Sequence, residues 1–177
     1  RPNLLNKAVG TNKNGIFPHG DLFIDECVER SMKAKEIATL ILEKEPFSEK
    51  QILDNFKENM NKLATRQKNW DIQIYDFIQE NYQKQQLFYN QGHPTNVLMV
   101  EIAKQVLEKL GVKGKPESKL YMDDYEEFVY PCVSKALLLK WEQTEIRKGE
   151  NIYKLAEKMD IQEYVQEYIW WCYQSVQ

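Results

Sequence analysis

The chain has 177 residues, of which 42% are hydrophobic and 29% charged, and its formal net charge is −3. This length is typical of one domain that buries a normal core without disulfides or metals. Glycine and proline are scarce, with seven and six residues, which argues against a β-sandwich or barrel because those folds need many tight turns. The balanced charge argues against nucleic-acid binding, and the basic cluster of Lys113, Lys115 and Lys119 is interpreted as a solvated loop.

The first twenty residues have no helical or strand periodicity, and prolines and glycines interrupt them. We expect residues 1–20 to form an extended N-terminal arm and residues 21–177 to form a helical bundle domain. The first helix is predicted over residues 21–43, because apolar residues recur there at intervals of three and four. Pro46 follows it and disfavours further helix.

Helix signals continue through the middle of the chain. Ser48 and Gln51 form a predicted capping box that opens a second helix, which extends to about residue 66. A third helix is predicted over residues 70–90. The segment that ends at Pro94 stops this third helix, and Thr95 begins a fourth. Gly111 is predicted to end the fourth helix, because glycine adopts the left-handed conformation without steric cost.

Three more helices are predicted after residue 120. The fifth spans residues 122–147, and Pro131 either kinks it or marks its true beginning. A short sixth helix includes Met159, and Asp160 with Glu163 forms a capping box for a seventh over residues 161–175. No strand is predicted. The sequence therefore predicts an all-α fold, a single irregular bundle of about six or seven amphipathic helices.

No catalytic, metal-binding or cofactor-binding motif is present, so none of these sites is assigned and no cofactor is expected. The acidic residues from Asp123 to Glu127 are interpreted as a helix start, where the helix dipole favours anions. His19 and His93 lack partners at metal-ligand spacing and are interpreted as turn or cap residues. Free buried thiols are expected at each cysteine, which favours an intracellular, cytoplasmic location; the cysteines are Cys27, Cys132 and Cys172.

Two classes of partner are disfavoured. The segment from Leu155 to Ile169 imitates a helix-turn-helix, but its second helix carries Glu163 and Glu167 and no lysine or arginine, which is the wrong charge for DNA. No apolar run approaches the length of a membrane span. Homo-oligomerisation is left open.

Aromatic residues are concentrated in the last third of the chain. In the last helix Trp170 falls on the polar stripe, which the wide apolar face of a bundle helix does not explain, and a partner-binding site is one interpretation. The alternative is that another segment of the chain covers it. The predicted partner-binding residues are Trp170, Trp171, Tyr164 and Tyr168. The leading hypothesis is a non-enzymatic interaction or adaptor domain. The alternatives are a carrier of a small apolar ligand and an enzyme whose site the sequence does not reveal.

Overall fold

The computed structural model describes residues 20–89, 92–116, 128–142, 146–148 and 157–173. These residues are mostly helical, which confirms the predicted all-α class. The α-helices are α1 (Leu22–Glu29), α2 (Ala34–Glu43), α3 (Glu49–Arg66), α4 (Tyr75–Asn81), α5 (Asn96–Lys109), α6 (Pro131–Ala136) and α7 (Ile161–Tyr173). A short 3-10 helix, η2 (Gln67–Asn69), follows α3. The strands β1 (Ile146–Lys148) and β2 (Glu157–Met159) form a small antiparallel sheet.

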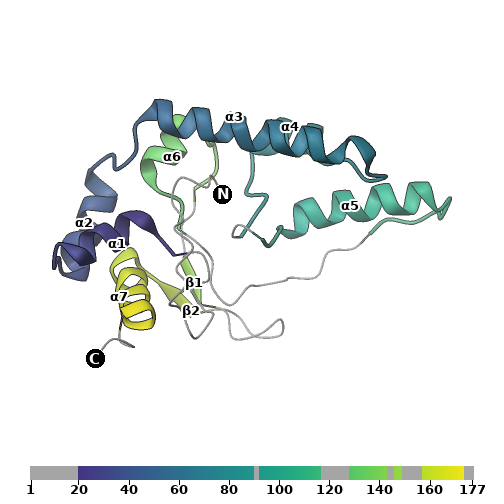
Figure 1. Cartoon of the computed structure of the whole chain (residues 1–177). Coiled ribbons are helices and arrows are strands. Elements are labelled where there is room, and N and C mark those ends of the chain that lie inside the picture. The colour runs from purple at the N-terminus through teal and green to yellow at the C-terminus, as the bar shows by residue number, and fades with distance from the viewer. Residues whose placement is uncertain (1–19, 90–91, 117–127, 143–145, 149–156, 174–177) are drawn as a thin grey trace.

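The helices gather around two hydrophobic clusters. In Figure 1, α1, α2 and α7 lie together at one end of the molecule, α5 lies at the other, and α3 runs along the top. The larger cluster joins α1, α2, α6 and α7, with Ile24, Ile37 and Val165 fully buried inside it. The smaller cluster lies around Ile78 and Leu98. The larger cluster therefore positions α7 against α1 and α2.

Several predicted helix ends are confirmed by their hydrogen bonds. The Ser48 backbone N–H donates to the Gln51 side chain at 2.9 Å, and the Gln51 N–H donates to the Ser48 hydroxyl at 3.3 Å. Asp160 and Glu163 exchange the equivalent pair of bonds at 2.9 and 2.8 Å. Each capping box satisfies two N–H groups that the first helical turn leaves without partners. Gly111 follows α5 with φ +65, as predicted.

The predicted helix over residues 21–43 is instead two helices, so that prediction is wrong. After α1 the Ser31 N–H donates to the Val28 carbonyl at 2.8 Å, and the Met32 N–H donates to the Cys27 carbonyl at 3.1 Å. This pair of bonds is the Schellman motif, and it requires a left-handed residue, here Ser31 with φ 59. The apolar spacing continues across the break, which is why the sequence pattern does not reveal it.

The third predicted helix, over residues 70–90, is reduced to the seven residues of α4. Its beginning is set by Gln67, which is buried. The Gln67 side-chain oxygen accepts the backbone N–H groups of Ile74 and Tyr75 at 2.9 and 3.0 Å. These bonds hold the intervening segment in a turn. A glutamine seven residues before the N-cap of a helix is not a capping signal that sequence rules contain, so the sequence does not reveal this boundary.

The predicted fifth and sixth helices also need correction. Pro131 is the first residue of α6, which confirms that it marks the beginning of a helix. The helix predicted over residues 122–147 is nevertheless wrong in its described part, because α6 ends at Ala136. Met159, predicted to be helical, lies in β2 and pairs with Ile146 of β1. Such pairing depends on residues distant in sequence, so local periodicity does not predict it.

Some predictions concern residues outside the described ranges. These include the extended arm apart from Gly20, and also His19, Asp123 to Glu127, and residues 149–156 of the predicted sixth helix. Within the described ranges, none of the helices combines the length and the apolar character that crossing a membrane requires.

Leu138 supplies a test of the helix-end geometry. It follows α6 with φ 53, and the Leu139 N–H closes a Schellman motif onto the Ser134 carbonyl at 3.0 Å. A left-handed conformation costs a non-glycine residue about 1 kcal/mol, and the Leu138 side chain is 68% exposed, so truncating it removes little packing. We expect Leu138→Gly to raise the free energy of unfolding by about 1 kcal/mol, measured by urea denaturation.

Gly111→Ala is the control, because it makes the opposite change at another left-handed position. A Cβ at Gly111 would meet no atom within 4 Å, so only the left-handed backbone is affected. This change should lower the free energy of unfolding by about 1 kcal/mol. A Leu138→Gly variant that is no more stable than the wild type would contradict the strain assigned to Leu138.

Candidate functional site

The residues predicted to bind a partner lie in different environments. Tyr164 and Tyr168 are 3% and 1% exposed and belong to the larger hydrophobic cluster. They are therefore core residues and are not available at the surface of the chain. Trp171 is half-buried, and its indole N–H donates to Glu167 at 3.0 Å. Trp170 is 48% exposed and its ring meets that of Trp171 edge-on, with centroids 4.4 Å apart.

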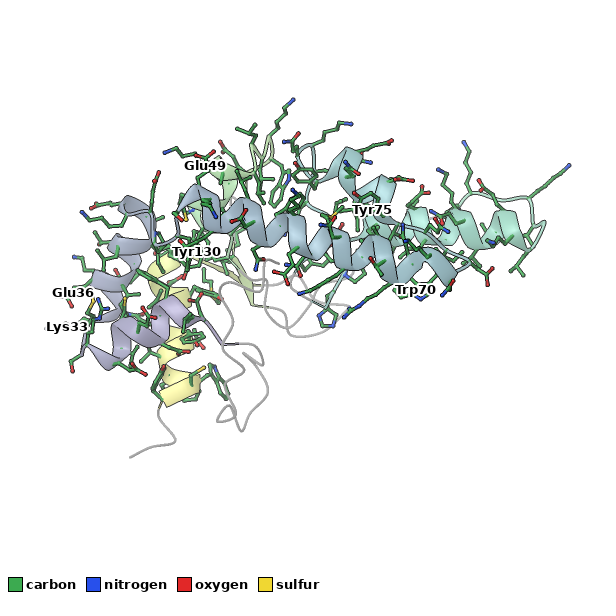
Figure 2. The ribbon with its side chains drawn as sticks, turned by 45° about the horizontal axis from the view of Figure 1, so that its top comes forward. Lys33, Glu36, Glu49, Trp70, Tyr75 and Tyr130 are labelled. Carbon is green, nitrogen blue, oxygen red and sulfur yellow. The ribbon has the colours of Figure 1, made fainter. Side chains whose placement is uncertain are left out.

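A buried carboxylate lies at the beginning of α1. Asp21 is 2% exposed, and one of its oxygens caps the helix by accepting the N–H groups of Phe23 and Ile24 at 3.0 and 3.2 Å. Its other oxygen accepts the Tyr130 hydroxyl at 2.8 Å. Figure 2 shows Tyr130 in the half of the molecule where α1, α2 and α7 gather. Asp21 therefore has both a local role and a long-range role.

A second carboxylate, Asp25, lies one helical turn further along α1 and is 7% exposed. One of its oxygens accepts the Tyr168 hydroxyl at 2.8 Å and also the Tyr173 hydroxyl. The Tyr168 oxygen in turn accepts the Asp21 backbone N–H at 2.6 Å. We call these five residues the Asp–Tyr network; they are Asp21, Asp25, Tyr130, Tyr168 and Tyr173. The network joins α1 to α7 and to the residue before α6.

The electrostatics of the network keep the hydroxyl groups of Tyr168 and Tyr173 protonated. Burial, together with the neighbouring Asp25 charge, raises the pKa of Tyr168 and of Tyr173 well above the usual tyrosine value. Burial and the same carboxylate raise the pKa of the Cys172 thiol to about 11. A phenol or thiol in this state donates hydrogen bonds but does not act as a base or nucleophile at neutral pH. The arrangement is suited to holding helices in place.

All three thiols lie in the core. Cys27, Cys132 and Cys172 are free and are 4%, 5% and 4% exposed, as predicted from the sequence. Burial is the largest cause that raises the pKa of Cys27 and of Cys132. All three thiols of the chain are therefore inert packing residues in this conformation.

No metal site is found where the side chains are described: no group of three or more histidine, cysteine or acidic residues there is arranged to hold an ion. His93 is exposed, in the short loop where Phe88 pairs with Pro94, and its carbonyl accepts the Tyr89 N–H at 2.8 Å. This position agrees with the interpretation of His93 as a turn residue.

Sequence reasoning missed both carboxylates of the network. Asp21 immediately precedes an apolar helix, which is an N-cap signal. Asp25 lies between the buried residues Ile24 and Cys27, so it borders the apolar stripe of α1. An acidic residue beside such a stripe could have indicated a buried carboxylate, but its tyrosine partners are more than 100 residues away and could not be identified from spacing.

The Tyr168 hydroxyl is the shared atom of the network and gives the sharpest test. Tyr168→Phe leaves the ring in place but removes the acceptor for the Asp21 N–H and one donor to Asp25. Leaving buried polar groups without a partner costs about 1–3 kcal/mol. We expect the free energy of unfolding, measured by urea denaturation, to fall by about 2 kcal/mol or more.

Tyr173→Phe is the matched control, because it removes one hydroxyl from the same Asp25 oxygen at a less buried position. It should cost about 1 kcal/mol, the usual net value of one hydrogen bond. Equal losses in the two variants would argue against Tyr168 as the central residue of the network.

Comparison with known proteins places this fold in a family. The family model described as polysaccharide biosynthesis enzyme WcbI matches residues 4–115 of the sequence. No curated protein matches the chain. A solved structure of WcbI superposes on this chain with a TM-score of 0.59. It is described as a novel polysaccharide biosynthesis enzyme, in its native form without a disulfide bond between coenzyme A and a cysteine.

The two proteins are 22% identical, and the superposition covers 87% of this chain and 52% of the WcbI chain. The likeness establishes a shared fold, and this chain spans about half the length of that structure. The family model covers well over half of the present sequence. The chain therefore belongs to the WcbI family of polysaccharide biosynthesis enzymes.

Proposed function

We propose that this chain forms part of an enzyme of polysaccharide biosynthesis. The observation that carries the proposal is the match of the WcbI family model to residues 4–115. This finding overturns the hypothesis of a non-enzymatic adaptor domain, and it favours the alternative of an enzyme whose site the sequence does not reveal. No motif in the chain names the reaction, so the proposal is limited to the process named for the family.

The Asp–Tyr network supports treating the chain as one functional unit. Asp21 and Asp25 lie inside the segment that matches the family model, whereas Tyr130 and Tyr168 lie beyond it. Buried carboxylates are stable only when they are hydrogen-bonded. The matched segment therefore needs the later residues to satisfy its own core.

Coenzyme A is named together with the solved WcbI structure, so its fit to this chain can be examined. A disulfide with coenzyme A requires an accessible thiolate. Cys27, Cys132 and Cys172 are each at most 5% exposed, and the pKa of each is raised. The thiols present do not fit a coenzyme A disulfide, and no chemical step is assigned through this group.

The fit of the thiols can be measured directly. In thiol–disulfide exchange, a protein thiolate would attack oxidised coenzyme A, form a mixed disulfide and release one coenzyme A thiol. We expect intact mass spectrometry of the native protein incubated with oxidised coenzyme A to show no adduct, because all three thiols are buried. The same incubation in guanidinium chloride should modify the thiols. A stoichiometric adduct on the folded protein would refute the structural role of the cysteines.

The proposed function is tested in the cells that carry the gene. Deleting the gene should reduce or shorten a polysaccharide that the cells make, measured by electrophoresis and sugar analysis of the extracted material. Restoring the wild-type gene should restore the polysaccharide, and the empty vector is the control. An unchanged polysaccharide profile in the deletion strain would count against the proposal.

A further inference from the structure

Trp170 lies on the exposed side of α7, among polar residues. Glu163, Gln166 and Trp170 follow one another at intervals of three and four residues, so they share one stripe of the helix. All three side chains are exposed, and 48% of Trp170 is open to solvent. The core takes the opposite face of α7, where Val165 and Tyr168 are buried. The Trp170 ring therefore contributes little to the core and is available to a ligand.

The orientation of the Trp170 ring is set by its neighbour. The rings of Trp170 and Trp171 are nearly perpendicular, with an interplanar angle of 88° and centroids 4.4 Å apart. The Trp171 ring is itself fixed, because its N–H donates to the Glu167 carboxylate at 3.0 Å and it packs against the larger hydrophobic cluster. A ring that is already ordered loses little conformational entropy when a ligand binds to it.

Polar groups lie beside this ring. Gln166 and Glu167 precede Trp170 by four and three residues, which makes them its neighbours on the helix surface. The Trp171 N–H binds one Glu167 oxygen, and a carboxylate has acceptor sites on both of its oxygens. The sequence of α7 contains two glutamates and no lysine or arginine. The local charge is therefore negative, which disfavours phosphate and carboxylate ligands.

An ordered indole ring bordered by acceptors matches the chemistry of a neutral sugar. One face of a pyranose ring presents C–H groups with a partial positive charge, and these complement the negative face of an indole. The hydroxyl groups project from the edge of the sugar, where a carboxylate accepts their hydrogen bonds. A neutral sugar also carries no charge that the glutamates would repel.

We propose that α7 carries a binding site for a neutral saccharide, in which the Trp170 ring stacks on the sugar and Glu167 accepts hydrogen bonds from its hydroxyl groups. We call Gln166, Glu167, Trp170 and Trp171 the α7 saccharide site. The inference rests on the proposed function, because a role in polysaccharide biosynthesis selects a saccharide among uncharged ligands. The site lies beyond the segment that matches the family model, so that match does not itself imply it.

Isothermal titration calorimetry of the purified full gene product tests the site. The titrant is a size-fractionated pool of neutral oligosaccharides, released by partial acid hydrolysis from the polysaccharide of the cells that carry the gene and freed of charged fragments by anion exchange. Trp170→Ala should weaken binding about tenfold, because the stacking ring is lost. Glu167→Gln keeps an acceptor for the Trp171 N–H but removes the charge, so it should weaken binding several-fold.

Trp70→Ala is the matched control, because Trp70 is 50% exposed and lies in the half of the molecule away from α7 (Figure 2). It should leave the affinity unchanged, and circular dichroism checks that every variant retains its helices. Equal weakening by Trp70→Ala and Trp170→Ala would contradict a site on α7.

Other outcomes would also overturn the α7 saccharide site. These are a wild-type protein that does not bind the oligosaccharides, and a Trp170→Ala variant that binds them as tightly as the wild type. Tighter binding of tetramethylammonium than of the oligosaccharides would identify a cation site instead. None of these results decides the proposed function, which depends on the polysaccharide made by the deletion strain. A deletion strain that loses its polysaccharide while the protein binds no saccharide would refute only the site.

Discussion

The hydroxyl group of Tyr168 makes the contacts on which the larger hydrophobic cluster depends. It accepts the Asp21 N–H at 2.6 Å and donates to Asp25 at 2.8 Å. Two carboxylates inside a hydrophobic cluster would oppose folding if they were left without donors. Their donors come from α7 and from the residue before α6, so the packing of α1 and α7 and the start of α6 are set together.

Local signals predicted most helix ends correctly. Ser48, Asp160 and Gly111 each act within three or four residues of their position, and the structure places all three where the sequence predicted. The features that were missed are set by distant contacts. Gln67 reaches seven residues along the chain to begin α4, and the strand pairing of Ile146 with Met159 spans a longer separation. Propensity and spacing do not contain this information.

The family match overturns the adaptor hypothesis, and the environment of the tyrosines explains why the sequence suggested a binding surface. An excess of tyrosine and tryptophan in the last third of the sequence suggests a binding surface, because these side chains are common in interfaces. Here Tyr164 and Tyr168 fill the core, and the Tyr168 hydroxyl serves a buried carboxylate. The same amphipathic character that suits a tyrosine to an interface also suits it to a core that contains charge.

The Asp–Tyr network also determines the order in which the chain can fold. Asp21 is hydrogen-bonded to Tyr130 and to Tyr168, which lie 109 and 147 positions later in the sequence. Contacts of such separation form slowly, because the loop that they close must first lose its conformational freedom. During synthesis α1 leaves the ribosome before α7, so Asp21 and Asp25 at first lack the hydroxyl groups that donate to them. The helix α1 therefore reaches its native environment only after α7 has been made.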